Sequence, residues 1–150
     1  MTISLSKYDR EQLFREFEEF LSQKKPEISI PLSIFSKSLS PFETVVKYLV
    51  ENSHLKYSKI GELLHKDRQV IWTTYKRAAK KCPELFQASD EKNSVPVASL
   101  VSDKFSIAEC LVGYLIENRN LKNSEVADLL KKDARTTWTF YKRYQDKKNE

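Results

Sequence analysis

The sequence predicts an all-α protein in which one extra helix precedes two copies of a three-helix unit. The chain has only 2 glycines among its 150 residues, and the strict alternation of polar and apolar residues that is typical of strands is rare. Residues 40–77 recur as residues 106–143, shifted by 66 positions, with 19 identities over the 38 aligned positions. Hydrophobic residues make up 40% of the chain, which is enough to build packed cores and argues against a disordered chain.

These observations predict a domain organisation with four parts. Residues 1–26 form an N-terminal amphipathic helix, residues 27–81 the first copy, residues 82–93 a linker, and residues 94–150 the second copy. Residues 82–105 contain Pro83, Pro96 and the polar run 89–94, a composition typical of a linker. We expect this segment to be mobile at residues 90–93 and too long to fix the spacing of the copies.

The N-terminal helix is expected from Ser6 to about Gln23. Its apolar residues fall on one stripe of a helix, at i, i+1, i+4, i+7 and i+8: Leu13, Phe14, Phe17, Phe20 and Leu21. The second copy has no counterpart. Two interpretations remain open, a lid that packs on the first copy and a helix that mediates homodimerisation or binds a partner.

Each copy opens with a proline-containing segment, Ile28 to Phe35 in the first and Ser94 to Leu100 in the second. Because the residue before proline is extended and proline suits a first helical turn, we expect an extended arm that enters a short helical turn. A short strand is the alternative for residues 28–34, which alternate with period 2.

Three helices follow in each copy. Ser40 with Glu43, and Ser106 with Glu109, predict a capping box at the start of the first helix. The second helix is expected at residues 58–64 and 124–130. Asp67 and Asp133 are expected to cap the third helix, which runs to about residue 81 in one copy and residue 147 in the other.

The positive charge is concentrated on the third helices. The net charge of the chain is +5, yet residues 65–81 hold six Lys/Arg against Asp67, and residues 131–148 hold seven against Asp133 and Asp146, so each segment carries +5. A charged helix is commonly just a solvated face. Two separate copies at +5 in an otherwise neutral or acidic chain favour binding to phosphate groups.

The second and third helices of each copy resemble a helix-turn-helix. Residues 58–64 read Ser-Lys-Ile-Gly-Glu-Leu-Leu and precede a short turn and a basic helix. They resemble the fourth, DNA-binding region of bacterial sigma factors and are similar to response-regulator output domains. The resemblance implies two tandem helix-turn-helix domains, each with a recognition helix that enters the major groove.

Carried over residue by residue, the resemblance assigns DNA contacts to the third helices. Their N-terminal halves are expected to read bases, and the Lys-Arg pairs to contact phosphates. Two other interpretations remain. In one the tryptophans only cover the core, and in the other the basic residues only form a solvent-exposed face without a ligand. The expected DNA-binding residues are Arg68, Gln69, Trp72, Thr73, Lys76 and Arg77 in the first copy, and Arg135, Thr136, Trp138, Thr139, Lys142 and Arg143 in the second.

The chain departs from the pattern of this family at two places, the first in both copies and the second in the second copy alone. His65 and Lys131 stand where such motifs commonly have a turn glycine, and Thr137 replaces the buried aliphatic residue Ile71. The second copy is therefore expected to be less stable or to contact something other than DNA.

Lys80 and Lys81 are expected to join the phosphate contacts of the first copy.

The function that we expect is sequence-specific binding of double-stranded DNA by a cytoplasmic transcriptional regulator. The alternative is a protein-interaction module that binds RNA polymerase or another assembly, and a basic helix with aromatic residues also suits structured RNA. No glycine-rich phosphate loop or nucleophile motif indicates an enzyme, and no His/Cys/acid cluster indicates a metal or cofactor. Cys82 and Cys110 stand at non-equivalent positions, which favours free thiols, and no apolar run is long enough to span a membrane.

Overall fold

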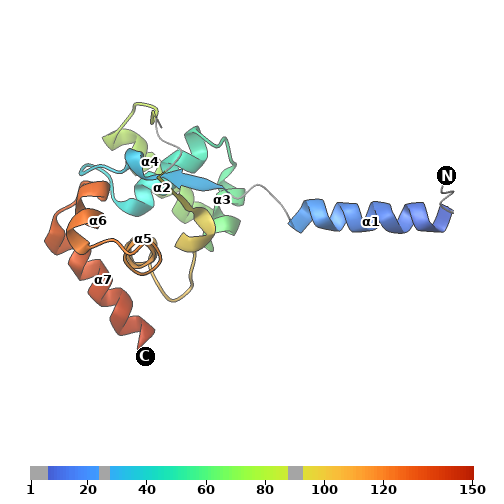
Figure 1. The fold of residues 1–150 in the computed structure, drawn as a ribbon. Coiled ribbons are helices and arrows are strands. Elements are labelled where there is room, and N and C mark those ends of the chain that lie inside the picture. Colours follow the sequence, from blue (N-terminus) through green and yellow to red (C-terminus); the bar gives the residue numbers. More distant parts are fainter. Residues whose placement is uncertain (1–6, 24–27, 88–92) are drawn as a thin grey trace.

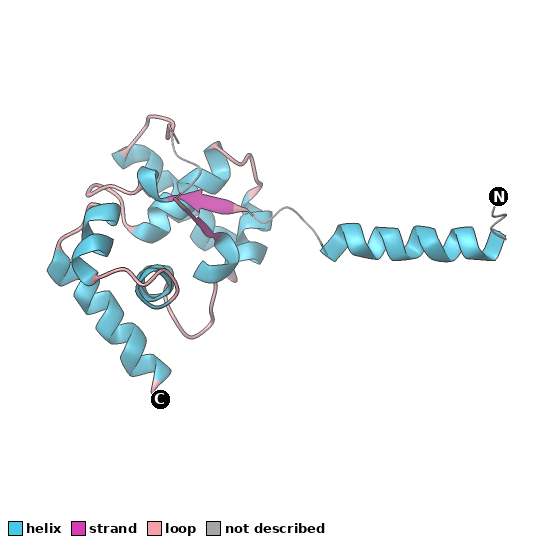
Figure 2. Ribbon diagram, in the orientation of Figure 1, coloured by secondary structure: helices cyan, strands magenta, loops and turns pink. Residues whose placement is uncertain are grey.

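The computed structural model describes residues 7–23, 28–87 and 93–150 and is mostly helical (Figure 2). This confirms the helical class predicted from the sequence. A small sheet of two strands is the exception. Most of the segment expected to be mobile, residues 90–93, lies outside the described residues, as do residues 1–6 and 24–27. Within the described part, no helix is long and apolar enough to cross a membrane.

The elements follow the chain in the order shown in Figure 1. The N-terminal helix is α1 (Lys7–Gln23). The first copy contains β1 (Ser29–Pro31), η1 (Leu32–Ile34), α2 (Pro41–Glu51), α3 (Tyr57–Leu64) and α4 (Arg68–Lys81). The second copy contains β2 (Ser94–Pro96), η2 (Val97–Leu100), α5 (Ile107–Glu117), α6 (Asn123–Leu130) and α7 (Ala134–Lys148).

Helices α2 and α5 begin where the sequence predicts, and for the predicted reason. The Ser40 hydroxyl accepts a hydrogen bond from the backbone N–H of Glu43 at 3.1 Å, and the Glu43 carboxylate accepts one from the N–H of Ser40 at 2.9 Å. Ser106 and Glu109 form the same capping box with the same two distances. Each box satisfies backbone N–H groups that a helix start otherwise leaves unpaired.

The turns between α3 and α4 and between α6 and α7 use a left-handed backbone without glycine. His65 has φ 56° and Lys131 has φ 54°, and His54 and Asn120 in the preceding loops each have φ 56°. All four are pairwise equivalent positions, so the two copies keep the same backbone although the residue types differ. A left-handed conformation costs a residue with a Cβ atom about 1–2 kcal/mol.

The two proline-containing arms pair with each other. β1 and β2 form an antiparallel ribbon with the register Ser29↔Pro96, Ile30↔Val95 and Pro31↔Ser94. Just beyond the strands, the N–H of Leu32 donates to the carbonyl of Asn93 and the N–H of Val97 to the carbonyl of Ile28, both at 2.8 Å. The arms are therefore short strands that enter a helical turn, and their pairing joins the two copies.

A single buried cluster runs through both copies. Leu49 and Ile71 of the first copy and Leu115 of the second belong to it, and Ile30 and Val95 of the ribbon join them in the middle. α2 packs against α5, α3 against η2, and α6 against η1. The spacing of the copies is therefore set by their packing and not by the linker.

The described side chains of helix α1 lie in solvent. Every residue from 9 to 20 is exposed, including Leu13 at 50%, Phe14 at 62% and Phe17 at 57%. Figure 1 shows this helix extending away from the other helices. The expected packing of this helix as a lid on the first copy is therefore not seen.

Candidate nucleic-acid interface

Helix α4 divides cleanly into a buried and an exposed face. Its N-cap is Asp67, whose carboxylate accepts a hydrogen bond from the N–H of Gln69 at 3.2 Å. Ile71, Thr74 and Ala78 are buried against α2 and α3. This spacing of three and four residues leaves the opposite face in solvent.

Helix α7 is built on the same plan with a different anchor. Thr137 is fully buried in place of Ile71, and its hydroxyl lies 2.8 Å from the side-chain oxygen of Asn123 and 3.1 Å from the carbonyl oxygen of Ala134. The Asn123 amide also donates to the Ala134 carbonyl at 3.0 Å. A polar pair thus satisfies the threonine hydroxyl, as a buried polar group requires. Asp133 occupies the N-cap position, but its side chain makes no capping hydrogen bond, contrary to expectation.

All the residues expected to contact DNA lie on these exposed faces. Those on α4 are Arg68, Gln69, Trp72, Thr73, Lys76 and Arg77, and those on α7 are Arg135, Thr136, Trp138, Thr139, Lys142 and Arg143. The six residues of the first copy therefore share one exposed face of α4, and the six of the second copy share the equivalent face of α7. Trp72 is 42% exposed and Trp138 is 52% exposed, which disfavours the interpretation that they cap the core.

The exposed side chains already contact one another in distinct ways. In the first copy the ammonium of Lys76 lies 5.8 Å from the centre of the Trp72 ring. In the second copy Trp138 packs on Tyr141, with 6.2 Å between ring centres, and Tyr141 stacks on Tyr144 at 6.3 Å. The two faces are therefore equivalent in position and unequal in chemistry.

The hydroxyls of the two exposed threonines are used within their own helices. Thr73 donates to the carbonyl of Gln69 and Thr139 to the carbonyl of Arg135, each at 2.9 Å. What these residues offer to a ligand is a methyl group and an acceptor lone pair.

Most of the cations on the two faces have no acidic partner. Arg68, Lys76, Arg77 and Lys80 on α4 form no ion pair with any residue that the structure describes. The same holds on α7 for Arg135, Lys142 and Arg143. Lys59, His65 and Lys148, by comparison, do have such partners. Cations left unpaired on one face are the electrostatic requirement for binding phosphate.

Lys81, which was expected to join the phosphate contacts, forms an ion pair within its own copy. Its ammonium lies 3.1 Å from the carboxylate of Glu43, which is 4% exposed, and Lys147 pairs with Glu109 in the same way. In each copy this ion pair joins the end of the third helix to the start of the first helix, α4 to α2 and α7 to α5. Both members of each pair are retained between the copies, a signal that was present in the sequence and points to this structural role.

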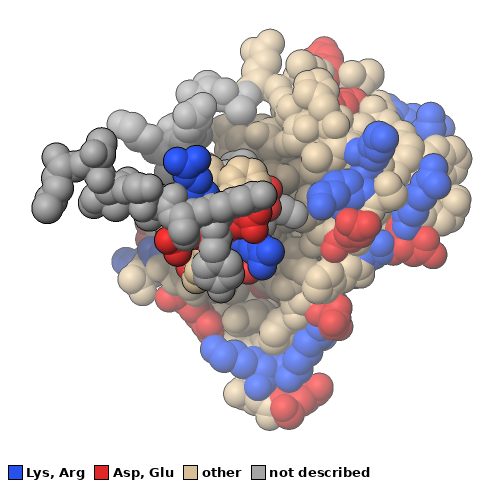
Figure 3. All heavy atoms as spheres, turned by 90° about the vertical axis from the view of Figure 1, so that its right-hand side faces the viewer, with Lys and Arg blue, Asp and Glu red and all other residues tan. Residues whose placement is uncertain are grey.

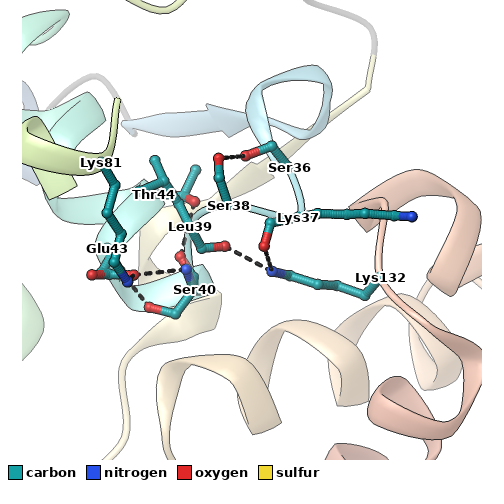
Figure 4. Close-up of polar contacts among 9 residues, drawn as sticks. All are labelled: Ser36, Lys37, Ser38, Leu39, Ser40, Glu43, Thr44, Lys81 and Lys132. Atoms are coloured by element: carbon teal, nitrogen blue, oxygen red, sulfur yellow. Dashed lines mark hydrogen bonds and ion pairs between the residues drawn. The ribbon is translucent and has the colours of Figure 1, made fainter. Parts of the chain in front are cut away.

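The turn before α7 makes hydrogen bonds to the first copy (Figure 4). The ammonium of Lys132 donates to the carbonyl oxygen of Leu39 at 2.7 Å and approaches that of Lys37 at 3.5 Å. Burial lowers the pKa of Lys132, Glu43 opposes this effect, and Lys81 adds to it. Sequence reasoning missed this residue because its partners are backbone atoms of the other copy.

The start of α4 borders an open hollow in the surface. Tyr57, Asp67, Arg68, Gln69 and Trp72 line it. Three of these, Arg68, Gln69 and Trp72, are among the residues expected to read bases. The hollow therefore places planar and hydrogen-bonding groups side by side at the helix start, where a recognition helix contacts base edges.

The charge on the face that Figure 3 presents is mixed. Figure 3 shows basic and acidic side chains interspersed on the face that it presents, with Lys and Arg also following the projection at the bottom, where Figure 1 places the end of α7. Among the described residues, no group of three or more His, Cys, Asp or Glu is arranged to hold a metal ion.

Comparisons with family models, with curated proteins and with solved structures gave no match for this chain. The candidate interface therefore rests on its own residues and on the relation between the two copies.

Proposed function

We propose that the protein is a sequence-specific double-stranded DNA-binding protein, a transcriptional regulator in which α4 and α7 are the recognition helices of two helix-turn-helix units. The observation that carries the proposal is the shared outer face of these helices. Both copies keep an exposed Trp-Thr pair and an exposed Lys-Arg pair, and these cations form no ion pair with the described residues of the chain. A surface kept twice with unpaired charge is best explained by an anionic ligand.

The residues divide into two roles by their place on the helix. Arg68 and Gln69 on α4 and Arg135 on α7 stand in the first turn, where a recognition helix meets base edges. An arginine suits the two acceptors of guanine, and a glutamine suits the donor and acceptor of adenine. The later Lys76–Arg77 and Lys142–Arg143 pairs suit phosphates, which position the protein without reading sequence.

Salt dependence tests the proposal. Four phosphate contacts release about four counterions, so the logarithm of affinity should fall with that of salt concentration with a slope of roughly −3 to −4. The measurement is a titration of the full chain into a fluorescent random duplex at several salt concentrations. Changing Lys76 and Lys142 together to alanine should weaken binding to all sequences and reduce the slope by about 2.

The matched control is Arg10→Ala, which also removes an exposed positive charge but lies on α1, away from both helix faces. It should leave the slope unchanged. The proposal would be contradicted if no binding to duplex DNA were seen. It would also be contradicted if the affinity changed neither with salt concentration nor with the substitution of Lys76 and Lys142.

A second candidate is a protein-interaction module that binds RNA polymerase or another assembly. Four large apolar side chains of α1 favour it, because they lie about half in solvent: Leu13, Phe14, Phe17 and Phe20. A chain that lacks DNA affinity but is retained by immobilised polymerase would favour this candidate. For either function we propose a cytoplasmic location, supported by the two free cysteines, Cys82 and Cys110.

A further inference from the structure

The two copies are related by a pseudo-twofold axis that passes through the ribbon. Pro31 aligns with Pro96, so Ile30 and Val95 are equivalent residues, and they are also the central pair of the antiparallel register. On either side of this pair, Ser29 faces Pro96 while Pro31 faces Ser94. Exchanging the two copies turns each of these pairs into the other.

The contacts outside the strands obey the same exchange. The bond from Leu32 to Asn93 becomes, under exchange of the copies, the bond from Val97 to Ile28, and both measure 2.8 Å. α2 packs on its own equivalent, α5, whereas α3 packs on η2 and α6 packs on η1. Contacts that map onto themselves when the partners are exchanged define an isologous interface, and a head-to-tail tandem has no such reciprocity.

Polar contacts across the interface repeat the reciprocity approximately. The turn after α3 contacts the segment before α5, where the His65 ring nitrogen lies 3.2 Å from the Asp103 carboxylate. In the other direction, the turn after α6 contacts the segment before α2, where Lys132 donates to the carbonyl of Leu39 at 2.7 Å (Figure 4). Two contacts between corresponding segments therefore cross the interface in opposite directions.

We infer from this symmetry, and on the basis of the DNA-binding function proposed above, that the target is an imperfect inverted repeat bound by a single chain. When two readers related by a twofold axis bind one duplex in the same way, that axis must coincide with a dyad of the duplex, which reverses strand direction. The half-sites are therefore inverted relative to each other. A head-to-tail tandem would select a direct repeat instead.

The half-sites are unequal because the readers are unequal. The first two positions of α4 are Arg68 and Gln69, and the equivalent positions of α7 are Ala134 and Arg135. The first half-site should thus carry a guanine and an adjacent adenine preference, and the second a guanine preference displaced by one position. Arg68 and Arg135 should each govern one half only.

The spacing between half-sites should be strict. The ribbon, the helix contacts and the shared buried cluster hold the copies together, so the linker cannot lengthen the span. Inserting five base pairs between the half-sites turns one of them by about half a helical turn, since a turn contains 10–10.5 base pairs. Affinity should then fall about tenfold or more, as when one half-site is lost.

The test is selection of binding duplexes from a random library by the full chain, followed by titration of designed duplexes. The expected consensus is two related halves in inverted order, and reversing one half should weaken binding about tenfold or more. Arg68→Ala should relax base preference in one half and Arg135→Ala in the other. Arg10→Ala should relax neither, because that arginine lies on α1.

The possible failures are distinguishable. A direct repeat, a single half-site, tolerance of the five-base-pair insertion, or one chain bridging two duplexes would overturn the inverted-repeat inference and leave the DNA-binding proposal standing. Absence of salt-dependent binding to any duplex would overturn the proposed function, and the inference with it.

Discussion

The ammonium group of Lys81 lies 3.1 Å from the buried carboxylate of Glu43, and Lys147 repeats this ion pair with Glu109 at 2.6 Å. Each pair fastens the last turn of the third helix to the first turn of the first helix. The same carboxylates also complete the capping boxes with Ser40 and Ser106. One acidic side chain therefore holds two helix ends in each copy.

These contacts predict how stability depends on pH. Burial alone would raise the pKa of Glu43, but the hydrogen bond from the Ser40 backbone and the Lys81 ammonium outweigh it, so the pKa lies below its ordinary 4.5. For Glu109 burial is outweighed by Lys147 and Ser106. A carboxyl group with a lowered folded-state pKa contributes its full stability above the unfolded-state pKa and loses it as pH falls through the folded-state value.

We expect Glu43→Gln and Glu109→Gln each to lower the free energy of unfolding by roughly 1–3 kcal/mol at pH 7. Each variant should also lose less stability than the parent protein as pH falls below 4.5, because the group that titrates is gone. Urea unfolding at a series of pH values measures both effects. The exposed Glu62→Gln is the control. An unchanged pH dependence in Glu43→Gln would contradict the assignment.

Lys131 holds a left-handed backbone conformation, with φ 54°, at the end of α6. Glycine adopts this conformation without the Cβ penalty, although it costs more entropy on folding. Lys131→Gly should therefore raise the free energy of unfolding by about 0.5–1 kcal/mol. His65→Gly should gain less, because His65 also contacts Asp103.

Thermal or urea unfolding checks this prediction. The matched control is Asp128→Gly, which places glycine at an exposed right-handed position of the same helix and should destabilise by about 1 kcal/mol. A Lys131→Gly variant that is less stable than the parent protein would show that the lysine side chain contributes more than its backbone costs.

Helix α5 approaches α7 where the two copies exchange a large and a small residue. Lys47, fully buried on α2, corresponds to Gly113, and Ala78 on α4 corresponds to Tyr144. A Cβ atom added to Gly113 would lie 2.8 Å from the Tyr144 ring, too close for van der Waals contact. In the second copy the small Gly113 thus makes room for the Tyr144 ring.

A double-mutant cycle tests this pairing. Gly113→Ala should destabilise the parent protein by about 1–3 kcal/mol through overpacking. In a Tyr144→Ala background the same change should cost little or even stabilise, since alanine favours a helix over glycine by about 1 kcal/mol. The background Tyr75→Ala, which changes the first-copy equivalent of Tyr141, is the control. Equal effects of Gly113→Ala in all three backgrounds would mean that no such coupling exists.

Local features of the fold were predictable from the sequence. The capping boxes at Ser40 and Ser106 depend on residues three positions apart, and the exposed faces of the third helices follow from helical spacing. The internal duplication indicated the candidate DNA-binding residues, because residues on the outside of a helix that both copies retain are not needed for the core. Helices α3 and α6 nevertheless begin one residue earlier than expected, at Tyr57 and Asn123.

The features that escaped prediction are long-range. Nothing local in the two arms indicates that Ile30 pairs with Val95, because strand pairing depends on distant residues. Lys47 is fully buried, where it pairs with Glu51, donates to the Glu84 carbonyl at 2.6 Å, and lies 4.3 Å from the Phe86 ring centre. A buried lysine is tolerated only with such partners, which a single sequence does not reveal.

Helix α1 should contribute little to the stability of the remaining chain. Its residues 9–20 are all exposed, and Phe14 and Phe17 have exposed fractions of 62% and 57%. Deleting residues 1–26 should change the free energy of unfolding by less than about 1 kcal/mol, as expected for surface changes outside a core. Thermal unfolding of the full chain and of residues 27–150 measures this, with Phe14→Ser in the full chain as a milder test. A large loss of stability in both the truncated chain and the Phe14→Ser variant would restore the interpretation of α1 as a lid.

Sedimentation of the full chain and of residues 27–150 tests the other interpretation of α1. A helix that mediates homodimerisation should give the full chain a larger mass in solution than the truncated one.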